Sequence, residues 1–208
     1  MKLSHSLLLP ALLACVPPAL AASNTQLAVQ GTITPSACQP SLGGGGNVDH
    51  GKVSAKDLNS DAHTSLQQAS MAFVLDCEGP TLIALKTIDN RAGTSIFPDW
   101  YAHGLGTTAQ GENLGSVRIA LNDPVADSVA VASIASTDDG VTWVPASPLG
   151  HGALTAFALK GDTANQPIAL QHLNANMTVY TTLEKASSLT LTDEVPIDGH
   201  ATLEVKYL

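Results

Sequence analysis

The side chains that could carry out chemistry are scattered along the 208-residue chain rather than grouped in motifs. Beyond residue 21 there are six histidines, and no two lie within five residues of each other: His50, His63, His103, His151, His172 and His200. Zinc sites often place two ligands at short spacings such as His-x-x-x-His, which are missing here. The sequence also has no Gly-x-Ser-x-Gly, His-Glu-x-x-His or phosphate-binding glycine motif. We therefore expect a protein that is not an enzyme and that holds neither a metal nor a cofactor.

The best candidate for a ligand surface is a turn-rich segment at about residues 89–112, which holds much of the scarce aromatic content. Aromatic faces beside amide and carboxylate groups suit sugar recognition, and binding residues favour loops on a rigid scaffold. The candidates are Asp89, Asn90, Arg91, Trp100 and Tyr101. Large aromatic side chains are also good anchors for a loop, so the alternative is that Trp100 packs against the edge of a sheet.

The first 21 residues have the order of a secretory signal peptide. Lys2 precedes an apolar stretch at 7–13, two prolines follow, and Ala19-Leu20-Ala21 forms a small-residue cleavage site. We predict cleavage after Ala21 and export through the periplasm to the cell surface. The run Leu12-Leu13-Ala14-Cys15 resembles a lipobox, so lipidation at Cys15 is the alternative, although the better Ala-x-Ala site lies beyond it.

With Cys15 inside the predicted signal, the exported chain contains two cysteines, Cys38 and Cys77. An even pair in an exported domain predicts a disulfide. The net charge is −9, with only nine lysines and arginines, which argues against a protein that follows the phosphates of a nucleic acid. The acidic surface is explained by solubility alone.

Residues 22–208 have the length of one domain, in which short alternating apolar runs are separated by turn residues. A helical turn is expected only at 54–58, and the four consecutive glycines at 43–46 must form a loop. The prediction is a single all-β domain with an irregular excursion at about 89–112. The expected strands are 27–33, 71–75, 82–87, 115–121, 129–134, 141–144, 153–159, 168–173, 178–183, 189–191 and 201–208.

Three stretches of the sequence resemble the pilins, the subunits of chaperone–usher fimbriae. Residues 31–38, Gly-Thr-Ile-Thr-Pro-Ser-Ala-Cys, are similar to the first pilin strand, which leads from a glycine into a cysteine. Residues 73–77, Phe-Val-Leu-Asp-Cys, are similar to the second strand, whose cysteine bonds the first one. Residues 199–208 resemble the C-terminal strand, with its alternating apolar residues and penultimate tyrosine. More narrowly, residues 48–51 and 89–91 are similar to a poorly characterised group of fimbrial-like exported proteobacterial proteins.

The resemblance implies an immunoglobulin-like β-sandwich with Greek-key connections, which in pilins lacks its final strand. A periplasmic chaperone lends a strand to the open groove, and an outer-membrane usher exchanges that strand for the N-terminal extension of another fimbrial subunit. By this resemblance the chaperone and donor-strand interface consists of Ala201, Leu203, Val205, Tyr207 and Leu208. Whether the fold of this chain is self-complete stays open.

Two features depart from the pilin pattern. Position 195 is a valine where pilins usually carry a glycine, and only residues 22–26 precede the first predicted strand. So short an arm suits a subunit that accepts a strand without donating one. The expected function is a structural subunit of a fimbria that supports cell adhesion. The alternative is a lectin-like adhesin, at the tip or on the surface, that binds a host or surface glycan.

Overall fold

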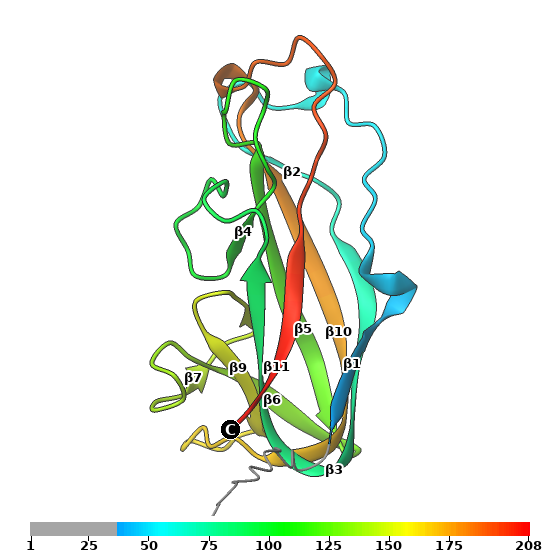
Figure 1. Ribbon diagram of the computed structural model, residues 1–208, viewed down its shortest axis with the longest axis vertical. Coiled ribbons are helices and arrows are strands. Elements are labelled where there is room, and N and C mark those ends of the chain that lie inside the picture. Colours follow the sequence, from blue (N-terminus) through cyan, green and yellow to red (C-terminus); the bar gives the residue numbers. More distant parts are fainter. Residues whose placement is uncertain (1–36) are drawn as a thin grey trace, which may run out of the picture. The chain divides into compact units, whose positions relative to one another are not determined.

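The computed structural model describes residues 37–208. The predicted signal peptide, Cys15 and the predicted strand at 27–33 lie outside the described residues. The described chain consists of strands and loops, with short 3-10 segments at Gly43–Gly46, Ala55–Asp57 and Ala186–Ser188 (Figure 1). The prediction of an all-β fold is confirmed for the described residues. The strands are β1 Cys38–Leu42, β2 Thr64–Ser65, β3 Ala69–Asp89, β4 Ala102–Gly104, β5 Gly115–Ala126, β6 Val129–Ser136, β7 Val144–Pro145, β8 Pro148–Leu149, β9 Leu154–Leu159, β10 Ala169–Leu183 and β11 Ala201–Tyr207.

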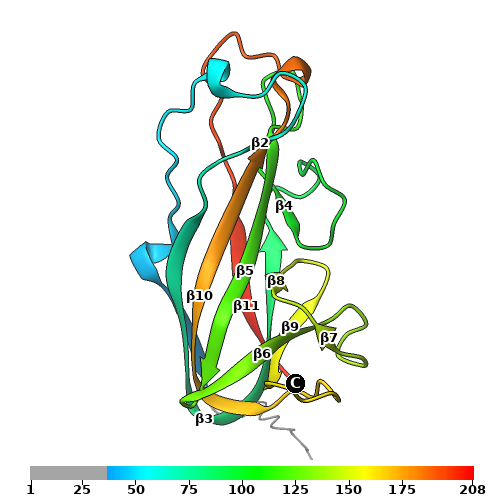
Figure 2. The same ribbon diagram turned by 180° about the vertical axis from the view of Figure 1, so that it is seen from behind.

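Strand β3, which is 21 residues long, organises the strand pairing. It pairs with β10 along its first half and meets β9 in its second half. Strand β9 pairs with β6, β6 with β5 and β5 with β10, so five strands form a closed ring of pairings. Figures 1 and 2 both show β3 bending at one end and returning along the other side. Strands β1 and β11 pair with β3 outside this ring, β1 with its first half and β11 with its second half.

Two pairs of predicted strands are in fact single long strands. The predicted strands 71–75 and 82–87 are both parts of β3, and 168–173 and 178–183 are both parts of β10. Pro80 does not interrupt β3, because β1 covers β3 only as far as Cys77 and β11 only from Ile83 onwards. A proline has no N–H group, so it is tolerated at a strand position where no neighbouring strand needs to accept a hydrogen bond from that residue.

Two other predicted strands are wrong. Residues 189–191 are not in a strand, and Leu189 and Leu191 instead belong to an apolar cluster with Leu105, Leu114 and Leu183. Residues 141–144 form a turn, from which only the last residue enters β7. The indole of Trp143 packs there against alanines of β3 and β9. In both places apolar side chains are buried by loop packing, which produces the same alternation as a strand ladder.

The main core is formed by side chains from all five strands of the ring. Its largest fully buried side chains include Phe73, Leu75, Leu85, Phe157 and Leu173. Burying each of them contributes roughly 1.5–3 kcal/mol. Leu203 and Val205 of β11 pack against the same core but remain partly exposed. Among residues 37–208, no helix has the length and apolar character needed to cross a membrane.

Candidate functional site

Strand β11 has one paired edge and one free edge. The N–H of Asn90 donates to the carbonyl of His200 at 3.0 Å, and the N–H of Leu208 donates to the carbonyl of Leu82 at 3.1 Å. In an antiparallel ladder hydrogen-bonded pairs alternate, so the even-numbered residues of β11 bond to β3. The odd-numbered residues, 201 to 207, then direct their N–H and C=O groups away from β3. Within 37–208, β3 is the only strand that pairs with β11.

Among the described strands, β1 pairs only with β3, so it presents a second free edge there. The N–H of Glu78 donates to the carbonyl of Ala37 at 3.1 Å, so Cys38, Pro40 and Leu42 direct their backbone groups away from β3. Because even-numbered residues of β3 bond to both strands, β1 and β11 lie along the same edge of β3. Exposed edges of this kind are templates for pairing with another chain.

The glycines at 43–46 end β1 after five residues. Gly44, Gly45 and Gly46 have φ values of 62°, 69° and 76°, and three consecutive left-handed residues are accessible only to glycine. The chain then continues as residues 46–50, which line a cavity together with β11.

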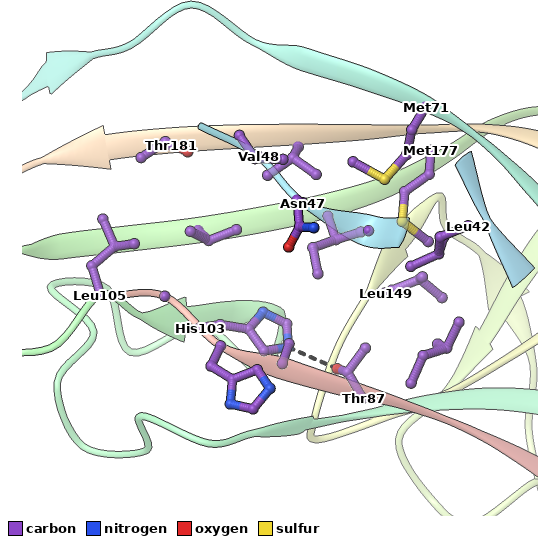
Figure 3. A pocket seen from close by; sticks show the side chains of 18 of the residues that line it. Leu42, Asn47, Val48, Met71, Thr87, His103, Leu105, Leu149, Met177 and Thr181 are labelled. Atoms are coloured by element: carbon purple, nitrogen blue, oxygen red, sulfur yellow. Dashed lines mark hydrogen bonds between the residues drawn. The ribbon is translucent and has the colours of Figure 1, made fainter. Parts of the chain in front are cut away.

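An apolar groove lies between β11 and the segment that follows β1. One cavity of about 280 Å³ is lined on one side by Leu42 and residues 46–50 and on the other by Ala201 and Leu203. Its floor is formed by side chains of β5 and β10: Val117, Ile119, Met177, Val179 and Thr181. Figure 3 shows Asn47 and Val48 across this cavity from His103 and Thr87.

A second cavity, of about 880 Å³, continues the groove between residues 48–55 and 191–197. The two cavities share Val48, His50 and Ile197, so they adjoin. We call the two together the edge groove. It follows the segments that flank the free edge of β11, and its inner lining is mainly aliphatic.

His103 places a polar ring in this aliphatic lining. Its side chain is 1% exposed, and its Nε2 atom is hydrogen-bonded to the hydroxyl of Thr87 at 2.7 Å. Burial lowers the pKa of His103, while the carboxylate of Asp89 opposes part of this shift. The carbonyls of Val117 and Tyr101 also favour the charged ring, but neither completes a hydrogen bond to the buried Nδ1 atom. The ring is therefore neutral at pH 7.

The lowered pKa of His103 predicts that the protein loses stability on mild acidification. Below about pH 6.5 the unfolded chain binds a proton that the buried ring does not, so the free energy of unfolding falls as the pH falls. In His103→Gln this slope should decrease by at most about 1.4 kcal/mol per pH unit. Urea unfolding between pH 7.5 and 5 measures it. The exposed His200, replaced by glutamine, is the matched control, and equal slopes in both variants would contradict the prediction.

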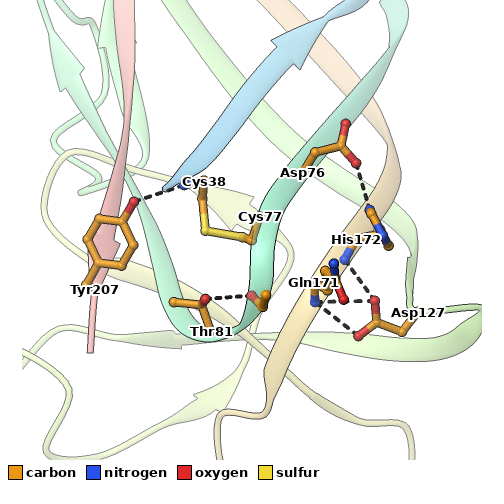
Figure 4. Close-up of a disulfide and its surroundings, with 9 residues drawn as sticks. Cys38, Asp76, Cys77, Thr81, Asp127, Gln171, His172 and Tyr207 are labelled. Carbon is orange, nitrogen blue, oxygen red and sulfur yellow. Dashed lines mark hydrogen bonds and ion pairs between the residues drawn. A yellow bond between two sulfur atoms is a disulfide. The ribbon is translucent and has the colours of Figure 1, made fainter. Parts of the chain in front are cut away.

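The predicted disulfide is present and lies beside one end of the edge groove. Cys38, the first residue of β1, is bonded to Cys77 of β3 (Figure 4). The N–H of Cys38 donates to the hydroxyl of Tyr207 at 3.0 Å, which joins β1 to β11. Tyr207 and Leu208 are 44% and 48% exposed, and of the predicted interface residues only Ala201 and Leu203 line the groove.

The residues predicted as a ligand surface lie in two separate environments. Asp89, Asn90 and Arg91 are engaged within the fold near the start of β11. Asp89 accepts from the N–H of Gly104 at 3.0 Å, Asn90 donates to Thr202 at 2.9 Å, and the Arg91 guanidinium pairs with Asp198 at 2.6 Å. Asn90 thus attaches the excursion to β11, Arg91 attaches it to the segment before β11, and Asp89 holds β4.

Trp100 and Tyr101 lie against a different part of the fold. The Trp100 carbonyl accepts from the N–H of Gly152 at 3.2 Å, and a side chain at Gly150 would overlap the Trp100 ring. The Tyr101 ring lies 5.3 Å from the guanidinium carbon of Arg118. A cavity of about 430 Å³ in this region is lined by Asp89 but by neither Trp100 nor Tyr101. The five predicted residues thus do not line one common cavity.

Three participants in the edge groove were not anticipated from the sequence: His103, Thr87 and the segment 46–50. His103 is one of six scattered histidines, and no spacing sets it apart. Residues 46–50 begin at the end of a glycine run, and residues 48–50 also belong to the stretch that resembles the fimbrial-like group, but neither signal places them at a groove. No set of three or more His, Cys, Asp or Glu side chains in the described part of the chain is arranged to hold a metal ion.

Comparison with known proteins finds one family of unknown function and two relatives from one bacterium. A family described as "Protein of unknown function (DUF1120)" matches residues 27–100. The chain is 25% identical over 226 residues to "Protein GltF" of Escherichia coli strain K12, which covers 89% of each chain. It is 24% identical over 225 residues to "Uncharacterized protein YhcF" of the same strain, covering 91% of this chain and 93% of the relative. The similarity therefore extends along nearly the whole of each of these two relatives.

Proposed function

We propose that this protein is a structural subunit of a bacterial surface fimbria that accepts a β-strand into its edge groove. The observation that supports this proposal most is the free edge that β11 has among the described strands. An apolar groove lies beside this edge, and β1 and residues 46–55 bound the groove on its other side. Strand addition needs both features, since main-chain pairing provides affinity and pockets for alternate side chains provide specificity.

The chemistry of the edge groove suits an extended segment with alternating apolar residues. The odd-numbered residues of β11 offer N–H and C=O groups in strand spacing, and Leu203 and Val205 contact the core while still partly exposed. A strand beside β11 would complete their burial and pair the free backbone groups. Leaving such an edge open invites aggregation, so a protective partner before assembly is expected.

On this proposal the fold is an immunoglobulin-like sandwich that lacks one strand. The two halves of β3 belong to its two sheets, and the missing strand lies between β11 and the segment that follows β1. A periplasmic chaperone supplies that strand first, and an outer-membrane usher then exchanges it for a segment of another subunit. The predicted signal peptide would bring the chain to the periplasm, and assembly by the usher would bring it to the cell surface.

The alternative, a glycan-binding adhesin that uses Trp100 and Tyr101, has less support. The Trp100 ring packs against residues 150–152, and Tyr101 lies beside Arg118. Asp89, Asn90 and Arg91 use their polar groups within the fold. Few groups at these positions are left for a sugar.

The proposal predicts binding of a repeating strand peptide. The probe is a peptide of nine alternating valines and threonines with lysines at both ends. It should bind residues 22–208, raise the melting temperature, and slow hydrogen exchange of the Ala201 and Leu203 amides. In Leu203→Asp the affinity should fall at least about tenfold, because the added carboxylate faces the apolar groove.

The matched control is Thr202→Asp, which places the same charge one residue away on the opposite, exposed side of β11. It should bind the peptide like the original protein. A second control is a peptide with proline in place of its central valine, which removes an N–H donor from the strand. The proposal fails if the original protein does not bind the repeating peptide, or if both aspartate variants bind it equally well.

A further inference from the structure

We propose that Tyr207 closes one end of the edge groove and so sets the register in which an added strand pairs with β11. This inference rests on the proposed function, namely that the edge groove accepts a strand. It concerns where that strand must stop, which the groove alone does not specify.

The Tyr207 side chain bridges the two free edges. Its hydroxyl accepts a hydrogen bond at 3.0 Å from the N–H of Cys38, although the two residues are 169 positions apart (Figure 4). That N–H belongs to the set of β1 backbone groups directed away from β3, as shown by the bond between Ala37 and Glu78. An added strand that extended this far would therefore meet the tyrosine ring and a donor already in use.

Both ends of the bridge are anchored on β3. Cys38 is held by its disulfide to Cys77, and Tyr207 lies opposite Ile83 in the β11 ladder. The lining of the groove agrees with a closed end. On the β11 side the cavity reaches Leu203, while Val205 and Tyr207 do not line it, and on the β1 side it reaches Leu42 but not Cys38.

In the other direction the groove is open. It continues past Gly199 to residues 191–197, where the second cavity lies. A strand can therefore extend along residues 195–203 but should end near Leu203. Register in a β-sheet is weakly specified unless the hydrophobic pattern or a fixed end determines it. A closed end provides that reference even for a peptide whose own sequence repeats.

The test measures hydrogen exchange, residue by residue by NMR, with the same repeating peptide at saturation. In the original protein the peptide should protect the amides of Ala201 and Leu203 but leave those of Val205 and Tyr207 exchanging as in the free protein. In Tyr207→Ala, peptide-dependent protection should extend to the amide of Val205, with exchange slowed at least about fivefold. The repeating peptide has no register preference, so the protein determines the difference.

Tyr207→Phe provides a second test in case Tyr207→Ala fails to fold. It keeps the ring and removes only the hydroxyl that accepts from the Cys38 N–H. Without this bond the ring is no longer held across the end of the groove, so Tyr207→Phe is also expected to extend protection to the Val205 amide. Lys206→Ala is the matched control, since that side chain is exposed and, within residues 37–208, forms an ion pair only with Glu204, and it should keep the original pattern. Protection of Val205 and Tyr207 in the original protein, or no extension in either tyrosine variant, would overturn the inference. No protection of Ala201 and Leu203 at all would instead refute the proposed function.

Discussion

Replacing Cys38 and Cys77 together by alanine is expected to lower the free energy of unfolding by about 4 kcal/mol. The disulfide joins residues 39 positions apart, and closing a loop of this length removes much conformational freedom from the unfolded chain. Typical domains are stable by only about 5–15 kcal/mol, so this is a large share. Urea unfolding of the double variant and the original protein measures the difference.

The reduced original protein is the control for this prediction. It lacks the bond but keeps both sulfur atoms, so it separates the loop effect from the small cavity that alanine leaves at the buried Cys77. Reduction should reproduce most of the loss. A change below about 1 kcal/mol on reduction would contradict the expectation, since loop entropy alone predicts several times more.

Replacing Trp100 by alanine is expected to lower the free energy of unfolding by about 3 kcal/mol. The Trp100 side chain is partly buried, with its ring in the space that Gly150 leaves and its Cβ in the space that Gly152 leaves. Replacing a fully buried tryptophan by alanine costs about 3–5 kcal/mol. Because Trp100 is only partly buried, we expect a loss at the lower end of this range. Chemical denaturation followed by circular dichroism measures it without relying on tryptophan fluorescence.

The matched control is Val141→Ala, which shortens an apolar side chain that is 79% exposed. Its stability should change by less than about 0.5 kcal/mol. The same variants separate the two interpretations of this segment. If Trp100→Ala abolished binding on a glycan array while leaving the unfolding curve unchanged, Trp100 would be a ligand residue and not a loop anchor.

Local patterns predicted most of the strands but not their continuity. The alternation at 115–121, 129–134, 153–159 and 201–208 places strands where β5, β6, β9 and β11 lie. It failed at 189–191 and 141–144, because apolar residues that cover a loop cluster alternate as they do in a ladder. The alternation also predicted two strands in place of β3 and two in place of β10. A bend within one strand interrupts the alternation in the same way as the end of a strand when the neighbouring strands are unknown.

The candidate site was predictable only where side-chain chemistry marks it. The two cysteines that lie beyond the predicted signal peptide are enough to predict their bond, which the structure contains. The two ends of the ligand candidate, Asp89 and Trp100, looked like one surface because they are near in sequence. In the structure their contacts differ, because Asp89 accepts from the N–H of Gly104 and Trp100 packs against Gly150 and Gly152.

The sequence by itself determined the all-β class, the cysteine pair and the alternating strand at the C-terminus, because the types and spacing of neighbouring residues are enough to predict each of them. Only the tertiary structure decided that β11 keeps a free edge within residues 37–208, that residues 46–55 face it across a groove, and that His103 and Tyr207 lie at that groove. Every residue carries the same backbone N–H and C=O groups, proline aside, so no residue type distinguishes a paired edge from a free one. Which backbone groups are left without a partner depends on segments more than a hundred residues apart, and the folded chain alone brings these together.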